Sequence, residues 1–84
     1  MKFQLNVVGP TGNDKIVNLC DTEEEMKLFT VEQLKTEITE QLDIDEDIRM
    51  VYGNKQLEES SLLISYGIQH LSTIHTVVKL PGGV

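Results

Sequence analysis

The chain has 84 residues and a formal net charge of -7, from 14 acidic and 7 basic residues. This length allows one domain with a core that needs no metal or disulfide, and the lone Cys20 rules out an intramolecular disulfide and a multi-cysteine zinc site. A single arginine in an acidic chain argues against a nucleic-acid partner, and we expect no membrane span and no signal peptide, which favours the cytoplasm and nucleus.

The first twenty residues predict a β-hairpin. Apolar residues alternate with polar ones from Met1 to Val7, and the segment 15–20 alternates again with Val17 and Leu19 on one face. The segment Gly9–Asp14 between them has the composition of a turn. A phosphate-binding loop is not expected there, because no Gly-Lys-Ser/Thr follows the glycines.

The main helix is predicted to start at Thr30, because Thr30 and Gln33 have the spacing of a capping box. Apolar residues then recur at spacings of three and four and form one core-facing stripe: Val31, Leu34, Ile38 and Leu42. The polar face is mainly acidic, whereas a helix that lies on a membrane surface is basic. The acidic segment 21–29 before the helix is expected to be an irregular connection.

After the helix, the sequence predicts an acidic loop and two short strands. The alternate carboxylates of residues 43–47 suggest a calcium loop, but the Gly and the closing Glu of that motif are missing, so no metal site is expected. Residues 48–52 alternate as a strand in which Arg49 and Val51 share the face opposite Met50. Residues 55–57 form at most an edge strand, and Gly67 is expected to have a positive φ.

The C-terminal residues predict a strand that continues into a thin tail. Even-numbered and odd-numbered residues of the segment 74–79 point to opposite faces, and Pro81, Gly82, Gly83 and Val84 follow. Because glycine has no Cβ, a Gly-Gly end fits a narrow channel of an enzyme that acts on the terminal carboxylate. The alternative is a frayed end without function, since chain termini are commonly disordered.

The order of hairpin, helix, short strands and long final strand predicts an α+β domain. We expect a mixed sheet of four to five strands with one helix across one face. Residues 1–80 form this domain, and residues 81–84 form a flexible C-terminal tail that contains the Gly-Gly pair.

Four segments of the chain resemble ubiquitin, in the same order as in that family and along almost the whole length. They are residues 49–58 (RMVYGNKQLE), 65–69 (SYGIQ), 72–75 (STIH) and the terminal pattern Leu80-x-Gly82-Gly83. The resemblance implies the β-grasp fold. Tyr66-Gly67 followed by Leu71-Ser72-Thr73 is also similar to the C-terminal domain of the interferon-induced two-domain ubiquitin-like modifier.

The resemblance implies a receptor-binding patch. Val51 falls on the isoleucine at the centre of ubiquitin's hydrophobic patch, His75 and Val77 fall on its histidine and valine, and Arg49 is assigned to the same surface. Strand parity independently places these residues on the face opposite the helix, where exposed apolar surface favours partner binding. Scattered exposed apolar residues without a role are the alternative. His75 lacks an acid or second ligand at useful spacing, so neither catalysis nor metal binding is expected of it.

The resemblance also implies roles for the tail. Gly82 and Gly83 are the conjugating glycines, with Gly83 forming the bond, and Val84 is an extension that a protease removes. Lys79 and Leu80 are the contacts of an activating enzyme, although Lys79 stands in place of an arginine and lacks its planar fork.

Several positions depart from the pattern of the family. Pro81 stiffens the tail, Asp45-Glu46 stands where ubiquitin has two prolines, and Thr76 occupies an inward position where the family has leucine. The loop before the helix is longer than ubiquitin's by about four residues. Lys55 falls on a lysine used for chain linkage, although an ordinary surface lysine is the simpler interpretation.

Three functions remain open. In the first, the chain is a protein modifier: an activating enzyme adenylates Gly83 with ATP, and conjugating and ligase enzymes transfer it to target lysines. In the second, it is a non-conjugated docking domain, alone or as one domain of a longer or tandem protein, which receptors bind through the patch. An enzyme is not expected, because no nucleophile–base pair, phosphate loop or metal set is present. We expect a monomer that uses no cofactor and binds neither nucleic acid nor membranes.

Overall fold

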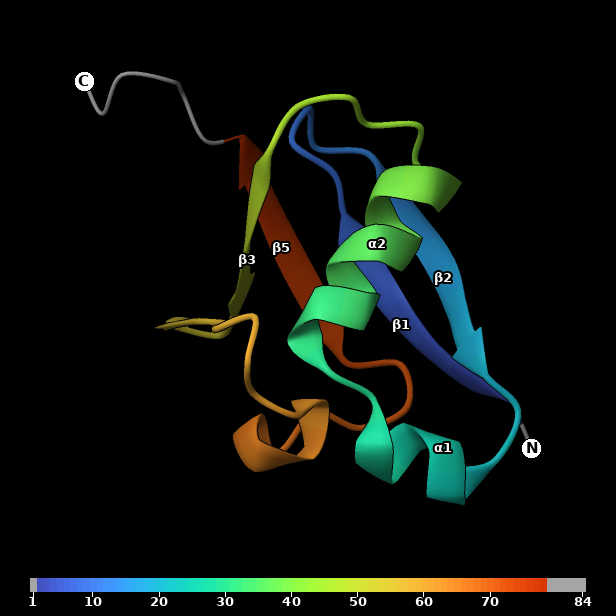
Figure 1. Cartoon of the computed structure of the whole chain (residues 1–84). Coiled ribbons are helices and arrows are strands. Elements are labelled where there is room, and N and C mark those ends of the chain that lie inside the picture. The colour runs from blue at the N-terminus through green and yellow to red at the C-terminus, as the bar shows by residue number, and fades with distance from the viewer. Residues whose placement is uncertain (1, 79–84) are drawn as a thin grey trace.

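The computed structural model describes residues 2–78 as a layer of strands with helices on one side (Figure 1). The elements in chain order are β1 (Phe3–Val8), β2 (Asp14–Cys20), α1 (Glu23–Leu28), α2 (Val31–Gln41), β3 (Ile48–Tyr52), β4 (Lys55–Gln56), the 3-10 helix η1 (Leu63–Tyr66) and β5 (Thr73–Val78). Within this part of the chain, none of the helices has the length and apolar character needed to cross a membrane.

The five strands form one mixed sheet in the order β2-β1-β5-β3-β4. β1 and β2 form the predicted antiparallel hairpin, and in its turn the Gly9 N–H donates to the Asn13 carbonyl at 2.8 Å. β5 runs parallel to β1 and antiparallel to β3, and β4 is a two-residue edge strand. A mixed sheet with one main helix confirms the expected α+β class.

α2 lies across one face of the sheet (Figure 1), and its start is fixed by the predicted capping box. The Thr30 hydroxyl accepts a hydrogen bond from the Gln33 N–H, and the Gln33 side chain accepts one from the Thr30 N–H, which satisfies two donors at the helix start. The completely buried residues of the helix are Val31, Leu34 and Ile38. They contact the inward-facing residues of the sheet, so this face holds the core.

The expectation of an irregular connection over residues 21–29 is wrong, because this segment contains α1. The Thr22 hydroxyl accepts a hydrogen bond from the Glu25 N–H at 3.1 Å, and the three glutamates of the first turn lie at the positive end of the helix dipole. None of the α1 residues is fully buried, so the helix has no apolar stripe that periodicity detects. The Thr22-x-x-Glu25 spacing was the available signal.

The connection from β4 to β5 contains η1, which buries Leu63 in the core. Gly67 ends η1 with a φ of 77°, which confirms the predicted positive φ. The Tyr66 hydroxyl accepts a hydrogen bond from the Glu58 N–H at 3.0 Å, and this bond ties η1 to the end of β4.

One lysine of α2 holds the loops on both sides of the β3–β4 pair. Lys35 Nζ lies 2.5 Å from Asp47 Oδ1 and 2.8 Å from Glu59 Oε1. Hydrogen bonds to Asp47 and then to Glu59 raise the pKa of Lys35 above its ordinary value. Asp47 precedes β3 and Glu59 follows β4, so this contact fixes both loops relative to the helix.

Candidate functional site

Four of the predicted site residues meet on the sheet face that is opposite α2. β3 and β5 pair antiparallel, with Arg49 opposite Val77 and Val51 opposite His75. Directly opposed residues of antiparallel strands point to the same face, so these four side chains lie on one surface. We call this surface, formed by Arg49, Val51, His75 and Val77, the outer-face patch.

The outer-face patch keeps its apolar side chains accessible. Val77 is 48% exposed and Val51 is partly buried, while Arg49 and His75 are exposed. The alternate residues of the same two strands face the core, which shows that parity alone decides which side chains reach solvent. The result is an apolar centre between two polar side chains.

Val8 lies next to the outer-face patch, a position that the sequence analysis does not predict. β1 and β5 are parallel, with Val8 in register with His75, so Val8, His75 and Val51 form one row across three strands. Val8 is partly buried. The available signal was the pair Val7-Val8, because strict alternation predicts a polar residue at position 8.

The chemistry of the outer-face patch suits binding. The outward positions of β3 and β5 carry no carboxylate, and they combine aliphatic groups with Arg49 and His75. Within residues 2–78, no three His, Cys, Asp or Glu side chains are grouped so that they can hold a metal ion. This surface therefore offers an apolar contact with polar edges, as protein-binding surfaces do.

Cys20 is the only thiol of the chain, and its surroundings do not activate it. Partial burial raises the pKa of the Cys20 thiol, and the negative charges of Glu25 and Asp21 raise it further, although the Thr22 backbone lowers it in part. The thiolate is the nucleophilic form. Cys20 is therefore protonated near neutral pH and is not poised for covalent catalysis.

Lys55 lies on the edge strand β4, opposite Tyr52, with its side chain exposed. Lys55 is therefore an exposed surface lysine at the edge of the sheet. The other predicted site residues lie outside the described residues, and their roles stay predictions: Lys79, Leu80, Gly82, Gly83 and Val84.

A helix that packs across a mixed sheet, after a first hairpin and before three further strands, defines the β-grasp class. The family model described as "Ubiquitin family" matches residues 26–81, which is two thirds of the chain. The chain belongs to the ubiquitin family. Members of this family are generally modifiers or ubiquitin-like domains and not enzymes.

The matched region contains α2, β3, β4, η1 and β5, and with them the four residues of the outer-face patch. The N-terminal hairpin and the first half of α1 lie outside it, as do Gly82 and Gly83. The match to the family therefore includes the residues of the outer-face patch but not the Gly82-Gly83 pair of the tail.

Proposed function

We propose that this protein is a ubiquitin-like modifier, conjugated to target lysines through Gly83 after a protease removes Val84. The observation that carries the proposal is a Gly82-Gly83 pair shortly after β5 in a member of the ubiquitin family. Receptors bind the conjugated domain through the outer-face patch. The domain itself is a substrate and a tag, without enzymatic activity.

The chemistry requires a free carboxylate on Gly83. An activating enzyme joins this carboxylate to AMP from ATP and releases pyrophosphate. A cysteine thiolate of the enzyme then displaces AMP to give a thioester. Conjugating and ligase enzymes pass the acyl group to a lysine amine, which forms an isopeptide bond and releases the thiol. Lys79 and Leu80 are the proposed contacts of the activating enzyme, and Lys55 is a proposed acceptor for chain growth.

The partners that this chemistry requires are found in the cytoplasm and nucleus, where we place the protein as a monomer. We also propose that interferon raises the transcript level of this protein. The basis is the similarity of Tyr66-Gly67 and Leu71-Ser72-Thr73 to the interferon-induced two-domain ubiquitin-like modifier. An unchanged transcript level in interferon-treated cells of the source organism would remove this assignment and leave the conjugation proposal intact.

A thioester assay tests the conjugation step. A version that ends at Gly83 is incubated with ATP and a panel of activating enzymes, and the products are separated on a non-reducing gel. We expect a higher band that disappears with added thiol. The same version carrying Gly83→Ala is the matched control, because its Cβ obstructs a channel shaped for glycine, and we expect it to give no band. Absence of a band with every enzyme overturns the proposal.

A non-conjugated docking domain is the second candidate function. It is supported by the outer-face patch, which lies wholly in the described domain and needs no tail, and by Pro81 and Val84, which depart from a conjugation-ready end. Receptor binding that is equal for the full chain and for residues 1–80, together with a negative thioester assay, is the result expected of this function.

A further inference from the structure

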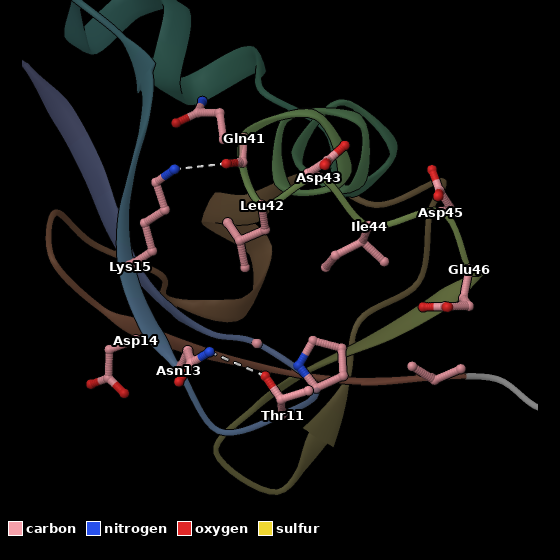
Figure 2. Close-up of a pocket in the computed structure, with 13 residues that line it drawn as sticks. Thr11, Asn13, Asp14, Lys15, Gln41, Leu42, Asp43, Ile44, Asp45 and Glu46 are labelled. Atoms are coloured by element: carbon pink, nitrogen blue, oxygen red, sulfur yellow. Dashed lines mark hydrogen bonds between the residues drawn. The ribbon is translucent and has the colours of Figure 1, made fainter.

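A groove at the C-terminal end of α2 forms a second surface (Figure 2), with a cavity of about 540 Å³. The β1–β2 turn borders it on one side and the α2–β3 loop on the other, with the end of β5 beside them. Leu42 and Ile44 project from the loop side toward the turn (Figure 2). We call this surface the acidic groove; its apolar floor is formed by Pro10, Leu42, Ile44 and Val78, and its rim by Asp14, Asp43, Asp45 and Glu46.

The carboxylates of the rim are available to a cationic partner. Among the described residues, Asp14, Asp43, Asp45 and Glu46 form no ion pair and no side-chain hydrogen bond. Among the described residues that line the groove, the cation is Lys15, and its Nζ donates to the Gln41 carbonyl at 2.7 Å. Four carboxylates therefore lie around the groove, and Figure 2 shows the side chain of Glu46 extending toward it.

The end of α2 adds to this negative potential. The last turn of the helix contains no basic residue, although cations are the favoured neighbours of the negative end of a helix dipole. Asp43 follows the helix with a φ of 53°, a conformation that glycine adopts more readily. The end of α2 is therefore not neutralised by a basic residue of its own last turn.

We propose that the acidic groove binds an extended basic segment of a partner protein, with one apolar side chain on the floor and flanking Lys or Arg side chains on the rim. The rim repels phosphate groups and acidic chains, which excludes anionic partners. The floor favours a segment that carries an apolar anchor over a simple cation, and the cavity volume lies in the range of pockets that take side chains or small ligands. This partner is independent of conjugation and of the outer-face patch.

Fluorescence anisotropy with labelled peptides tests the proposal on the full chain. The probe peptide has one leucine flanked by arginines; its two variants replace the arginines with glutamates or the leucine with serine. We expect saturable binding of the probe, none of the glutamate variant, and binding of the serine variant that is weaker by about fivefold. Spermine that competes as strongly as the probe would overturn the apolar part of the proposal, because it provides charge without an anchor.

Matched variants separate the groove from the overall charge of the protein. Asp45→Asn with Glu46→Gln removes two charges at the rim, and Glu23→Gln with Glu24→Gln removes two charges on α1, away from the groove. We expect the rim pair to weaken binding about fivefold and the α1 pair less than about twofold. Equal losses would show that only net charge attracts the peptide and would overturn the proposal.

A second pair of variants tests the floor. Ile44→Ala removes part of the floor, and Ile64→Ala makes the same change on η1, where the side chain is exposed. We expect about a fivefold loss for Ile44→Ala and none for Ile64→Ala, with circular dichroism confirming that both variants fold. Amide chemical shifts of the wild-type protein give an independent readout. We expect the probe peptide to shift the amides of residues 11–15 and 42–46. Shifts that centre on residues 49–51 and 75–77, with none at the groove, would show that the peptide binds the outer-face patch and would overturn the proposal.

Discussion

The outer-face patch and the acidic groove both offer apolar side chains, but they are built and charged differently. The patch lies on paired strands, so the ladder between β3 and β5 fixes the neighbours of every side chain. The groove is formed by a turn and a loop, and Lys15 and Lys35 hold the elements around it. The outward positions of β3 and β5 carry no carboxylate, whereas four line the groove.

This difference predicts two modes of recognition on one small acidic domain. A partner of the outer-face patch gains most of its affinity from apolar burial, which salt affects little. A partner of the acidic groove gains affinity and encounter rate from opposite charge, which salt screens. The net charge of -7 is therefore expected to affect binding at the acidic groove more than binding at the outer-face patch. Changes that affect one surface at a time can separate the two modes.

The largest expected effect removes both surfaces together. Leu34 is completely buried on the core-facing side of α2, so Leu34→Ala is expected to lower the free energy of unfolding by about 2–5 kcal/mol. Urea denaturation measures this loss, with the exposed Glu32→Ala on the same helix as the control. Both binding activities are expected to fall in proportion to the unfolded fraction. A loss below about 1 kcal/mol is typical of surface positions and would mean that α2 does not cover the core.

The next effect is confined to the outer-face patch. Val51→Ala combined with Val77→Ala removes the apolar centre and is expected to weaken binding to ubiquitin-receptor domains by about tenfold or more, as measured by calorimetric titration. The stability of the protein and its affinity for the basic probe peptide are expected to change little. Ile16→Ala is the control, because Ile16 is exposed on β2, which is separated from β5 by β1. Unchanged receptor affinity in the double variant would contradict the role of the patch.

Salt then compares the two surfaces without any substitution. Raising NaCl from about 50 mM to about 300 mM shortens the Debye length by more than half, and we expect the probe peptide to bind the acidic groove about fivefold more weakly. Binding of a receptor domain to the outer-face patch is expected to change less than about twofold. Parallel titrations in the two buffers measure both. Equal salt sensitivity would mean that the charge difference between the surfaces does not control recognition.

The sequence predicts the outer-face patch better than the groove, because the patch follows from alternation within single strands, whereas the groove depends on contacts between segments that are distant in sequence. Strand parity is a local property, so the alternation of residues 48–52 and 74–79 is enough to assign Val51 and Val77 to the face opposite Met50. Thr76 likewise falls on an inward position; it is 4% exposed, and its hydroxyl donates to the Val8 carbonyl at 2.8 Å. Which strands are neighbours came from the family resemblance, because pairing across the chain leaves no mark in periodicity.

The acidic groove was missed because it depends on the contact between two irregular segments. Pro10 and Ile44 lie far apart in sequence, and only the packing of the hairpin beside α2 brings their segments together. The carboxylates of residues 43–47 predict an acidic loop and, with the Gly and Glu of the motif missing, no calcium site; both interpretations consider the run alone and not the surface beside it. α1 was missed for a related reason, since a helix without a buried residue has no apolar period.

The smallest expected effect concerns the lysine that positions the loop of the groove. Lys35→Met removes the contacts with Asp47 and Glu59 but keeps the aliphatic part of the side chain, and both acids are more than half exposed. The loss of stability is therefore expected to be about 0.5–1 kcal/mol at neutral pH. Asp47 ends the loop that forms the rim, so the affinity of the probe peptide is expected to change by about twofold, while receptor binding stays constant.

The pH dependence of Lys35→Met identifies the cause of this loss. The folded-state pKa of Lys35 is raised above its unfolded value of about 10.4, so its contribution is fully present below that pH and is lost as the pH rises through the folded-state pKa. The stability difference between wild type and variant is therefore expected to be constant from neutral pH to about pH 10 and to shrink above it. Urea denaturation across this range measures the difference. A difference that persists undiminished into the alkaline range would assign the effect to side-chain packing, and the loop of the groove would then be held by contacts other than charge.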